Sequence, residues 1–242
     1  MLSFIKYQNE MSPDQLNFLN ETLTRTFIEK FLENGNVAID AGANHGLHTS
    51  TMVSSVGTSG HVHAYEPNVL LHGSLREILR PGIDILHRLA VGARKEESDF
   101  HIPADDGWAT LNPSVLGGQP RRIERVNIEL MDSTICPFDK IRLIKLDIEG
   151  HELPALFGAA RIVKESRPFL IIEEPYSNET VNFINTFGYE SFDLLGNRLQ
   201  SEEHIFPNYF GIPKEHSKLF KRRYKIDSND VFKKYFENFN HF

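Results

Sequence analysis

The sequence predicts an α/β protein with a doubly wound, mostly parallel sheet and an antiparallel C-terminal hairpin. Short apolar runs alternate with segments of helical periodicity along most of the 242 residues, a pattern typical of right-handed β-α-β crossovers. Four of the runs stop on a carboxylate, namely Asp40, Glu66, Asp147 and Glu173. Because ligands of such sheets bind at the carboxyl ends of the strands, we expect these acids to share one edge of the sheet.

The N-terminal elements follow from local signals. The stretch "SPDQ" at residues 12–15 provides an N-cap serine, a proline at the first helical position and a glutamine at N3, which predicts a helix. Gly35 is expected to end it. Residues 36–40 form an apolar strand and residues 49–56 a helix, after which "HVHAYEP" predicts the second strand. Asn68 caps the next helix, and "IDILHRLAVG" predicts a third strand that runs into a loop.

The C-terminal part continues the alternation and adds two hairpins. Strong apolar runs predict buried strands, and alternating segments predict half-exposed ones. The expected elements are an added hairpin of residues 97–103 and 125–131, strands 141–147 and 168–174, helices at about 152–164 and 178–187, and a closing antiparallel hairpin of residues 189–195 and 204–213.

The composition is that of a globular protein, with 40% hydrophobic and 24% charged residues. The single cysteine, Cys136, excludes an internal disulfide framework and favours a reducing compartment. No apolar run approaches the roughly 20 residues of a membrane span, and the N-terminus lacks the features of a signal peptide. We therefore expect a cytoplasmic protein.

Three regions are predicted: an N-terminal helical segment (1–35), a ligand-binding domain (36–212) and a basic, aromatic helical tail (213–242). The tail carries eight Lys or Arg against four Asp or Glu, whereas the formal net charge of the whole chain is -7, which argues against nucleic acid as a general partner. The tail also places aromatic side chains at helical spacing, and we expect them to dock on the protein itself, with a homodimer contact as the alternative. These residues are Phe232, Tyr235, Phe236 and Phe239.

The turn after the first strand differs from the dinucleotide fingerprint. It runs from Gly42 to Gly46, with Asn44 in place of a middle glycine, and asparagine tolerates left-handed backbone. Asp40 would repel a pyrophosphate but suits an amine, while the helix N-terminus behind it suits a carboxylate. Glu66 ends the second strand, where an acid commonly accepts hydrogen bonds from two ribose hydroxyls. An amino acid joined to a nucleoside describes S-adenosylmethionine.

The segments "IDAGANHG", "HAYEPN", "IKLDIEGHELPALFGA" and "PFLIIEE" occur in this order. On these segments the chain resembles the FkbM-type S-adenosylmethionine-dependent methyltransferases over about residues 36–195. The resemblance implies a seven-stranded, Rossmann-like class I fold. It also implies O-methylation of a hydroxyl on a small-molecule or glycan acceptor, such as a sugar, a polysaccharide or a natural product.

The resemblance assigns the methionine part of the cofactor to the glycine loop, the ribose to Glu66 and the adenine to the residues after the third strand. Trp108, in residues 106–111, departs from the small residues usual there, and either stacks on a ligand or fills the core. The expected cofactor-binding residues are Asp40, Gly42, Ala43, Asn44, Gly46, Glu66, Pro67, Ala90, Val91 and Asp147.

A hydroxyl acceptor must lose its proton, and "LDIEGHE" places Asp147, Glu149 and His151 just past a central strand. One hypothesis makes His151 or Asp147 the general base. The other makes Asp147, Glu149 and Glu173 a site for Mg²⁺ or a similar cation that lowers the pKa of the hydroxyl. Both stay open, and we favour the base, so a divalent cation is not assigned outright.

Two other functions compete with methyl transfer. A nicotinamide-dependent oxidoreductase is disfavoured by the missing G-x-G-x-x-G and by Asp40, and a non-catalytic S-adenosylmethionine-binding partner subunit is the second alternative. His61 and His63 share one face of a strand, but no cysteine or third histidine lies at ligand spacing. We therefore expect structural or solvated histidines rather than a zinc site.

Overall fold

The computed structural model describes residues 12–103, 109–116, 118–174, 177–199 and 207–226. Its main sheet consists of β1 (Val37–Ala41), β2 (His61–Tyr65), β3 (Ile85–His87), β7 (Ile141–Leu146), β8 (Phe169–Glu173), β9 (Tyr189–Asp193) and β10 (Asn208–Pro213). The strand order is β3-β2-β1-β7-β8-β10-β9, and only β10 runs antiparallel to its neighbours. This confirms the predicted doubly wound, seven-stranded sheet with an antiparallel C-terminal hairpin.

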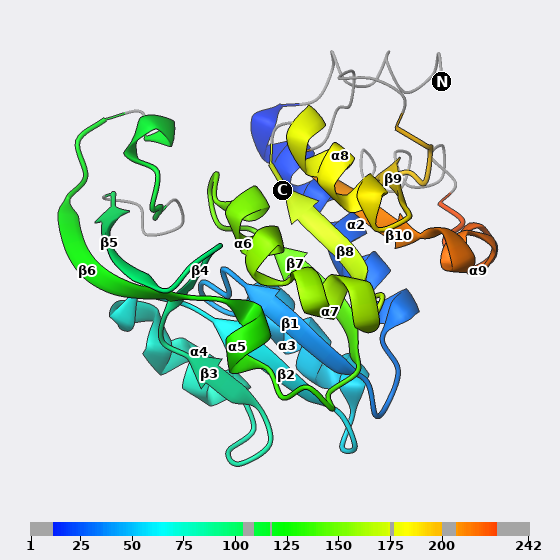
Figure 1. Cartoon of the computed structure of the whole chain (residues 1–242), viewed down its shortest axis with the longest axis horizontal. Helices are drawn as coiled ribbons and strands as arrows, with labels where there is room; N and C mark the ends of the chain where they lie inside the picture. The colour runs from blue at the N-terminus through cyan, green and yellow to red at the C-terminus, as the bar shows by residue number, and fades with distance from the viewer. Residues whose placement is uncertain (1–11, 104–108, 117, 175–176, 200–206, 227–242) are drawn as a thin grey trace, which may run out of the picture.

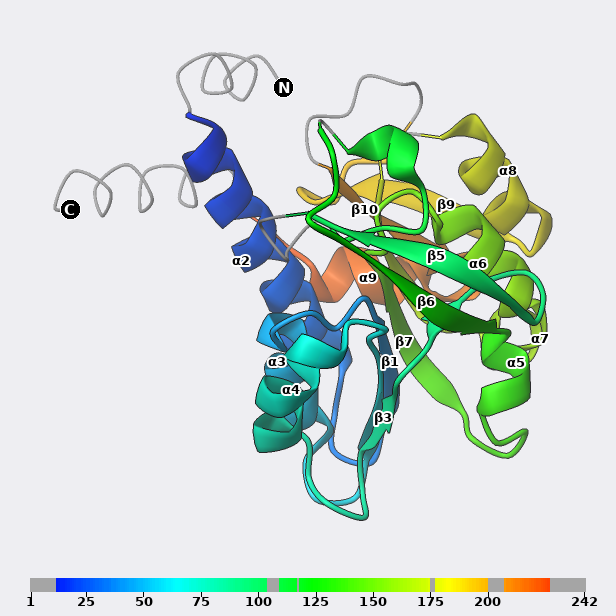
Figure 2. The ribbon, with the colours of Figure 1, turned by 90° about the vertical axis from the view of Figure 1, so that its left-hand side faces the viewer.

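Helices cover both faces of this sheet (Figure 1; Figure 2). One face carries α2 (Pro13–Phe31), α3 (Leu47–Val56), α4 (His72–Ile78) and α9 (Ser217–Arg223). The other carries α5 (Met131–Thr134), α6 (Glu152–Gly158), α7 (Ala160–Glu165) and α8 (Asn178–Thr186), and short 3₁₀ turns are η1 (Val69–Leu71), η3 (Pro113–Val115) and η4 (Lys214–His216). No helix of the described residues is long and apolar enough to cross a bilayer.

A second, three-stranded sheet projects from the edge of the main one (Figure 1). It contains β4 (Ala90–Val91), β5 (Glu96–Ile102) and β6 (Arg122–Glu129) in the order β4-β6-β5, with β5 and β6 antiparallel. This confirms the added hairpin but corrects the single strand expected from "IDILHRLAVG". The run is split into two strands. β3 ends at His87, whose carbonyl accepts the Glu66 N–H (3.0 Å), and Ala90 then pairs with Ile128 of β6 in the other sheet.

The first helix begins as predicted but ends early. The capping box is formed, because Gln15 N–H donates to Ser12 Oγ and Ser12 N–H donates to Gln15 Oε1. The helix stops at Phe31 rather than at Gly35, because Leu32 adopts an extended backbone that buries its side chain. Gly35, with φ +90°, instead forms the turn into β1.

The single helix expected at about 152–164 is also corrected, because it is broken into α6 and α7. A Cβ at Gly158 would lie 2.0 Å from the Gly92 carbonyl oxygen, so α6 ends in a close backbone contact. The Asp132 carboxylate then accepts the N–H groups of Arg161 (2.7 Å) and Ile162 (3.0 Å). This side chain caps a new helix at a point where the sequence alone shows no break.

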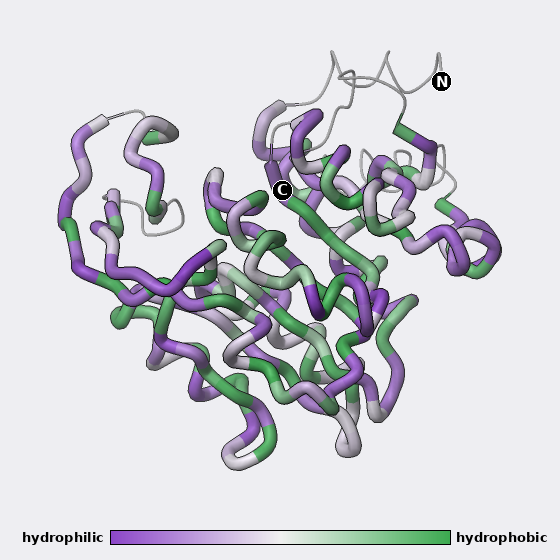
Figure 3. The backbone as a smooth tube through the Cα atoms, viewed as in Figure 1, coloured by the Kyte–Doolittle hydropathy of each residue, from purple (hydrophilic) through white to green (hydrophobic). Residues whose placement is uncertain are grey.

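The described parts of the predicted terminal segments pack in one core with the sheet. The ring centroid of Phe27 in α2 lies 3.9 Å from that of Phe210 in β10 and 6.2 Å from that of Phe220 in α9. The Tyr224 hydroxyl donates to the Leu194 carbonyl (2.8 Å). Hydrophobic residues concentrate along the inner strands (Figure 3). The predicted aromatic stripe of the tail (Phe232, Tyr235, Phe236 and Phe239) lies outside the described residues.

Phe220→Ala should therefore destabilise the protein by about 3–5 kcal/mol, because it empties a site that is 1% exposed inside this aromatic cluster. Chemical denaturation would measure the loss. Phe138→Ala is the matched control, since Phe138 is 91% exposed and its loss should change stability by less than about 0.5 kcal/mol. Equal midpoints for the two variants would show that α9 is not part of the folding core.

Candidate active site

A pocket that is partly open to solvent lies at the carboxyl ends of β1, β2 and β7. This is the edge at which the sequence places its strand-ending acids, and it is where ligands of doubly wound sheets bind. The second sheet forms one wall, through Ala90, Val91 and Phe100. The predicted site residues that line the cavity are Gly42, Asn44, Glu66, Pro67, Ala90, Val91, Asp147, Glu149 and His151.

Glu66 joins the glycine loop to the start of the next helical turn. Its carboxylate accepts hydrogen bonds from the N–H groups of Asn44 (2.9 Å) and Asn68 (2.7 Å). Burial raises the pKa of Glu66 to about 7, although both N–H donors act in the opposite direction. The remaining lone pairs of this buried carboxylate are available to hydroxyl donors in the cavity.

The glycine loop packs against the loop after β7 and presents one free acceptor near the cavity. Asn44 has φ +50°, as its tolerance of left-handed backbone predicts. A Cβ on Gly42, at φ +82°, would lie 1.8 Å from the Asp147 carbonyl oxygen, so only glycine fits between the two loops. Asn44 Oδ1 is buried and has no hydrogen-bond partner among the described residues, which leaves an acceptor for a ligand N–H group.

Three predicted cofactor residues, Asp40, Ala43 and Gly46, are not part of the cavity lining. Asp40 is 1% exposed, and its Oδ2 accepts a hydrogen bond from Thr49 Oγ1 (2.6 Å). Ala43 packs in a small cluster with Leu75, and Gly46 has φ +90° at the start of α3. These residues shape the loop from beneath, and Trp108 lies outside the described residues.

A buried lysine, which the sequence reasoning passed over, supports the strand ends from one face. Lys145 of β7 is 1% exposed and donates to Asp147 Oδ2 (2.6 Å). It is paired with Asp40 in the sheet register, so both side chains emerge on the same face. Burial alone would lower the pKa of Lys145, but Asp147, Asp40 and Glu173 outweigh it and raise that pKa above its ordinary value.

The loop after β7 is held in an unusual conformation. Glu149 has φ +53°, and its carbonyl accepts a hydrogen bond from Thr110 Oγ1 (2.7 Å). Glu152 is buried, and its Oε1 accepts the N–H groups of Ile148 (3.0 Å) and Gly150 (3.2 Å). Glu152, the first residue of α6, therefore holds the loop between β7 and this helix in place.

Two titratable side chains of the cavity lining, His151 and Glu149, have shifted pKa values. Burial lowers the pKa of His151, with the Glu96 carboxylate acting in the opposite direction, so the ring is neutral near neutral pH. Burial, with Asp147 beside it, raises the pKa of Glu149 to about 7. A neutral imidazole and a half-ionised carboxyl group therefore face the same cavity.

The carboxylates proposed as a cation site are not gathered into one. Glu173 does not line the cavity, and burial beside Asp147 raises the pKa of its carboxyl group. Within the described residues, the one group of at least three His, Cys, Asp or Glu ligand atoms within 4.8 Å of one another is elsewhere. The oxygens of Asp147, Glu149 and Glu173 do not form such a group.

Sequence reasoning also missed most of the apolar lining, which comes from loops and from the second sheet. These residues are Leu71, Leu89, Phe100, Leu111 and Ile148, together with the Tyr65 ring. A lysine inside the apolar run of residues 141–146 was a usable signal for Lys145, because an unpaired buried ammonium is unfavourable. The loop residues carry no comparable local signal.

Comparison with known proteins places this geometry among methyltransferases. Residues 40–195 match the model of the family described as "Methyltransferase FkbM domain". The solved methyltransferase FkbM of Methylobacillus flagellatus KT is 21% identical with a TM-score of 0.51, over 74% of this chain and 44% of that chain. This chain therefore spans less than half the length of that protein, and the likeness is one of fold.

Two other solved structures are more distantly similar. A putative rRNA-methylase from Clostridium thermocellum is 12% identical with a TM-score of 0.44, over 77% of this chain and 90% of that chain. A SAM-dependent O-methyltransferase from Thermotoga maritima is 12% identical with a TM-score of 0.43, over 84% of this chain and 66% of that chain. A search of curated proteins found no significant match.

Lys145→Met should destabilise the protein by about 3–5 kcal/mol, since it leaves buried carboxylates without their cation. The loss should be larger at about pH 8 than at about pH 5, because carboxyl groups with raised pKa values are stabilised while protonated and destabilised as pH rises through the folded pKa. Urea denaturation at both pH values would measure it. Lys140→Met, at an exposed lysine, is the control, and a similar small loss in both variants would contradict the role of Lys145.

Proposed function

Since the chain belongs to the FkbM methyltransferase domain family, we propose that it transfers a methyl group from S-adenosylmethionine to a hydroxyl oxygen. The acceptor class that we propose is a sugar, a polysaccharide or a hydroxylated natural product. Family membership supports methyl transfer in general. The choice of an oxygen acceptor rests on the resemblance of the sequence motifs and on the proton acceptors beside the cavity.

The observation that carries the proposal is the excess of acids at the carboxyl edge of the sheet. Glu66, Asp147 and Glu149 line the cavity and Asp40 lies beneath it, whereas Lys145 is the one buried lysine or arginine among the described residues. S-adenosylmethionine, when bound, supplies an electrophilic methyl group on a positively charged sulfur. A cavity with uncompensated carboxylates favours such a ligand over a pyrophosphate, which would add negative charge.

The individual groups fit the parts of this cofactor. The Glu66 carboxylate offers free lone pairs for two ribose hydroxyls, and Gly42 and Asn44 offer close backbone and the orphan Oδ1 for the amino-acid part. Ala90 and Val91 provide an apolar wall for a planar base. In this assignment Asp40 acts through the loop and through Lys145 rather than by contact.

We assign His151 the role of general base. Its ring is half-buried in the cavity wall and neutral near pH 7, so its free nitrogen can accept the proton of an acceptor hydroxyl. The loop hydrogen bonds of Glu152 and Thr110 fix the segment that carries it. Alignment and exclusion of water supply the remainder of the rate enhancement.

Glu66→Ala should weaken the binding of S-adenosylhomocysteine by about 1–3 kcal/mol, because a buried charged acceptor is lost. Wild-type affinity should also fall by roughly tenfold between about pH 8 and about pH 6, since protonation through a pKa near 7 removes the carboxylate. The variant should lack this pH dependence. Isothermal titration calorimetry measures both effects, with NADH as a competing ligand that should not bind.

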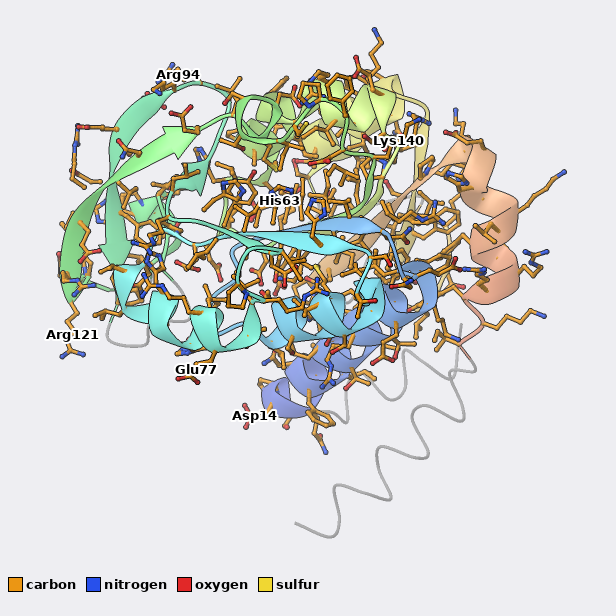
Figure 4. All side chains as sticks on the ribbon, turned by 90° about the horizontal axis from the view of Figure 1, so that it is seen from below. Asp14, His63, Glu77, Arg94, Arg121 and Lys140 are labelled. Carbon is orange, nitrogen blue, oxygen red and sulfur yellow. The ribbon has the colours of Figure 1, made fainter. Side chains whose placement is uncertain are left out.

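Glu77→Ala is the matched control, because Glu77 is exposed on α4 (Figure 4) and should leave the affinity unchanged. Thermal unfolding of each variant checks that the loop remains folded. Unaltered affinity in Glu66→Ala would remove Glu66 from the cofactor site, and tight binding of NADH would favour the oxidoreductase alternative.

His151→Ala should lower turnover by roughly 10²–10⁴-fold and leave the affinity for S-adenosylhomocysteine nearly unchanged. Wild-type activity should persist somewhat below the ordinary histidine pKa, because burial keeps the ring neutral there. Release of S-adenosylhomocysteine with a panel of hydroxylated acceptors measures turnover.

His216→Ala, at a partly exposed histidine of η4 outside the cavity lining, is the control for loss of an imidazole. The cation hypothesis makes the opposite prediction, in which added Mg²⁺ raises turnover and Asp147→Asn is more damaging than His151→Ala. Full activity of the His151→Ala variant would show that His151 is not the general base.

A further inference from the structure

Three side chains meet at the edge of the sheet opposite the cavity. His61 is the first residue of β2, and His63 follows two positions later on the same face. Asp139 lies in the turn before β7, which the Asp139 N–H closes by donating to the Cys136 carbonyl (3.0 Å). Because Val37 of β1 pairs with both His61 and Ile141, the starts of β2 and β7 flank the same strand.

The distances suit a shared ion better than hydrogen bonds. Asp139 Oδ2 lies 3.7 Å from His61 Nε2 and 3.8 Å from His63 Nε2, beyond hydrogen-bonding range. All three ligand atoms lie within 4.8 Å of one another. Ligand atoms around a tetrahedral zinc ion are about 3.4 Å apart. The two Asp139–histidine distances exceed this spacing by about 0.3–0.4 Å, and the two histidine ligand atoms, which lie within 4.8 Å of each other, would move closer when they bind the metal.

A hydrogen bond to His87 orients the His63 ring. Its Nδ1 lies 3.0 Å from His87 Nε2, while its Nε2 is buried and has no hydrogen-bond partner among the described residues. His63 is 2% exposed and lies inside the fold (Figure 4). When Nδ1 donates to His87, the Nε2 lone pair faces Asp139, and a cation between them removes the repulsion. In the reverse tautomer the Nε2–H group would point toward the Asp139 carboxylate at 3.8 Å, which is too far for a hydrogen bond.

His87 is itself held in place by the wall of the cavity. Its ring stacks on Tyr65 with centroids 4.2 Å apart and an interplanar angle of 8°. The Tyr65 hydroxyl is hydrogen-bonded to Thr134 Oγ1 (2.7 Å). This arrangement resembles the outer partners that fix the orientation of metal-bound imidazoles in proteins.

We propose that His61, His63 and Asp139 bind one Zn²⁺ ion, with water in the remaining coordination position. Two imidazoles and one carboxylate suit zinc better than the oxygen-seeking Mg²⁺ or Ca²⁺. The side chains of His61 and Asp139 are each 25% exposed, which gives the ion and its water a path from solvent. The site is independent of the proposed methyl transfer and ties the start of β2 to the segment before β7.

The test uses the full chain without an affinity tag, stripped of metal by dialysis against a chelator. Calorimetry with ZnCl₂ should give one site per chain and thermal unfolding a higher midpoint with zinc, whereas MgCl₂ should do neither. His61→Ala and Asp139→Asn should lose the stoichiometric site. Both change partly exposed positions, so their folding can be verified by circular dichroism.

His45→Ala should keep the site and is the control for adventitious binding to exposed histidines. His87→Phe keeps a ring against Tyr65 but removes the acceptor for His63, so it should weaken zinc binding by roughly 10–100-fold. Absence of a stoichiometric site in the wild type would overturn the proposal. So would equal zinc affinity in the wild type, His61→Ala and Asp139→Asn.

Discussion

The buried ammonium of Lys145 is the charge on which the carboxyl edge of the sheet depends. It lies on the central strand β7, beside Asp40 of β1, and donates to Asp147 (2.6 Å) at the first residue of the following loop. Without these acids burial would favour the neutral lysine, and without the lysine the acids would have to take up protons. Since Asp147 both pairs with Lys145 and lines the cavity, this ion pair fixes the position from which the loop of residues 147–151 departs.

Helix α2 lies beside Lys145 on the face of the sheet that also carries α9. Glu21 of α2 lies close enough to Lys145 and Asp147 for both to influence its pKa, which burial raises. Further along the same helix, Phe27 and Phe31 pack against Phe220 of α9. The same helix therefore contributes one side chain beside the Lys145–Asp147 pair and two rings to the aromatic core of the fold.

The sequence predicts those features that have local causes. The alternation of elements predicted the sheet, the strand-ending acids predicted the edge that carries the cavity, and Asn44 adopts the left-handed backbone its chemistry allows. Features that depend on strand order could not be predicted from the sequence. Asp139 meets His61 only because β7 and β2 both flank β1, and Asp132 starts α7 from a separate helix. Such contacts join distant segments, and neither partner shows a periodic or capping signal of its own.

The acids of the cavity and the ring that shapes its wall come from neighbouring strands. Glu66 follows β2, and Asp147 and Glu149 follow β7, where Lys145 is influenced by Asp147, Asp40 and Glu173. The shape of the opposite wall comes from β2, because Tyr65 is fixed by His87 on its ring face and by Thr134 at its hydroxyl. His87 in turn contacts His63, so the wall and the histidine cluster are parts of one rigid stack. The cavity wall on β2 and the histidine cluster are thus connected by direct side-chain contacts, whereas Lys145 and Asp147 belong to β7 and the loop after it.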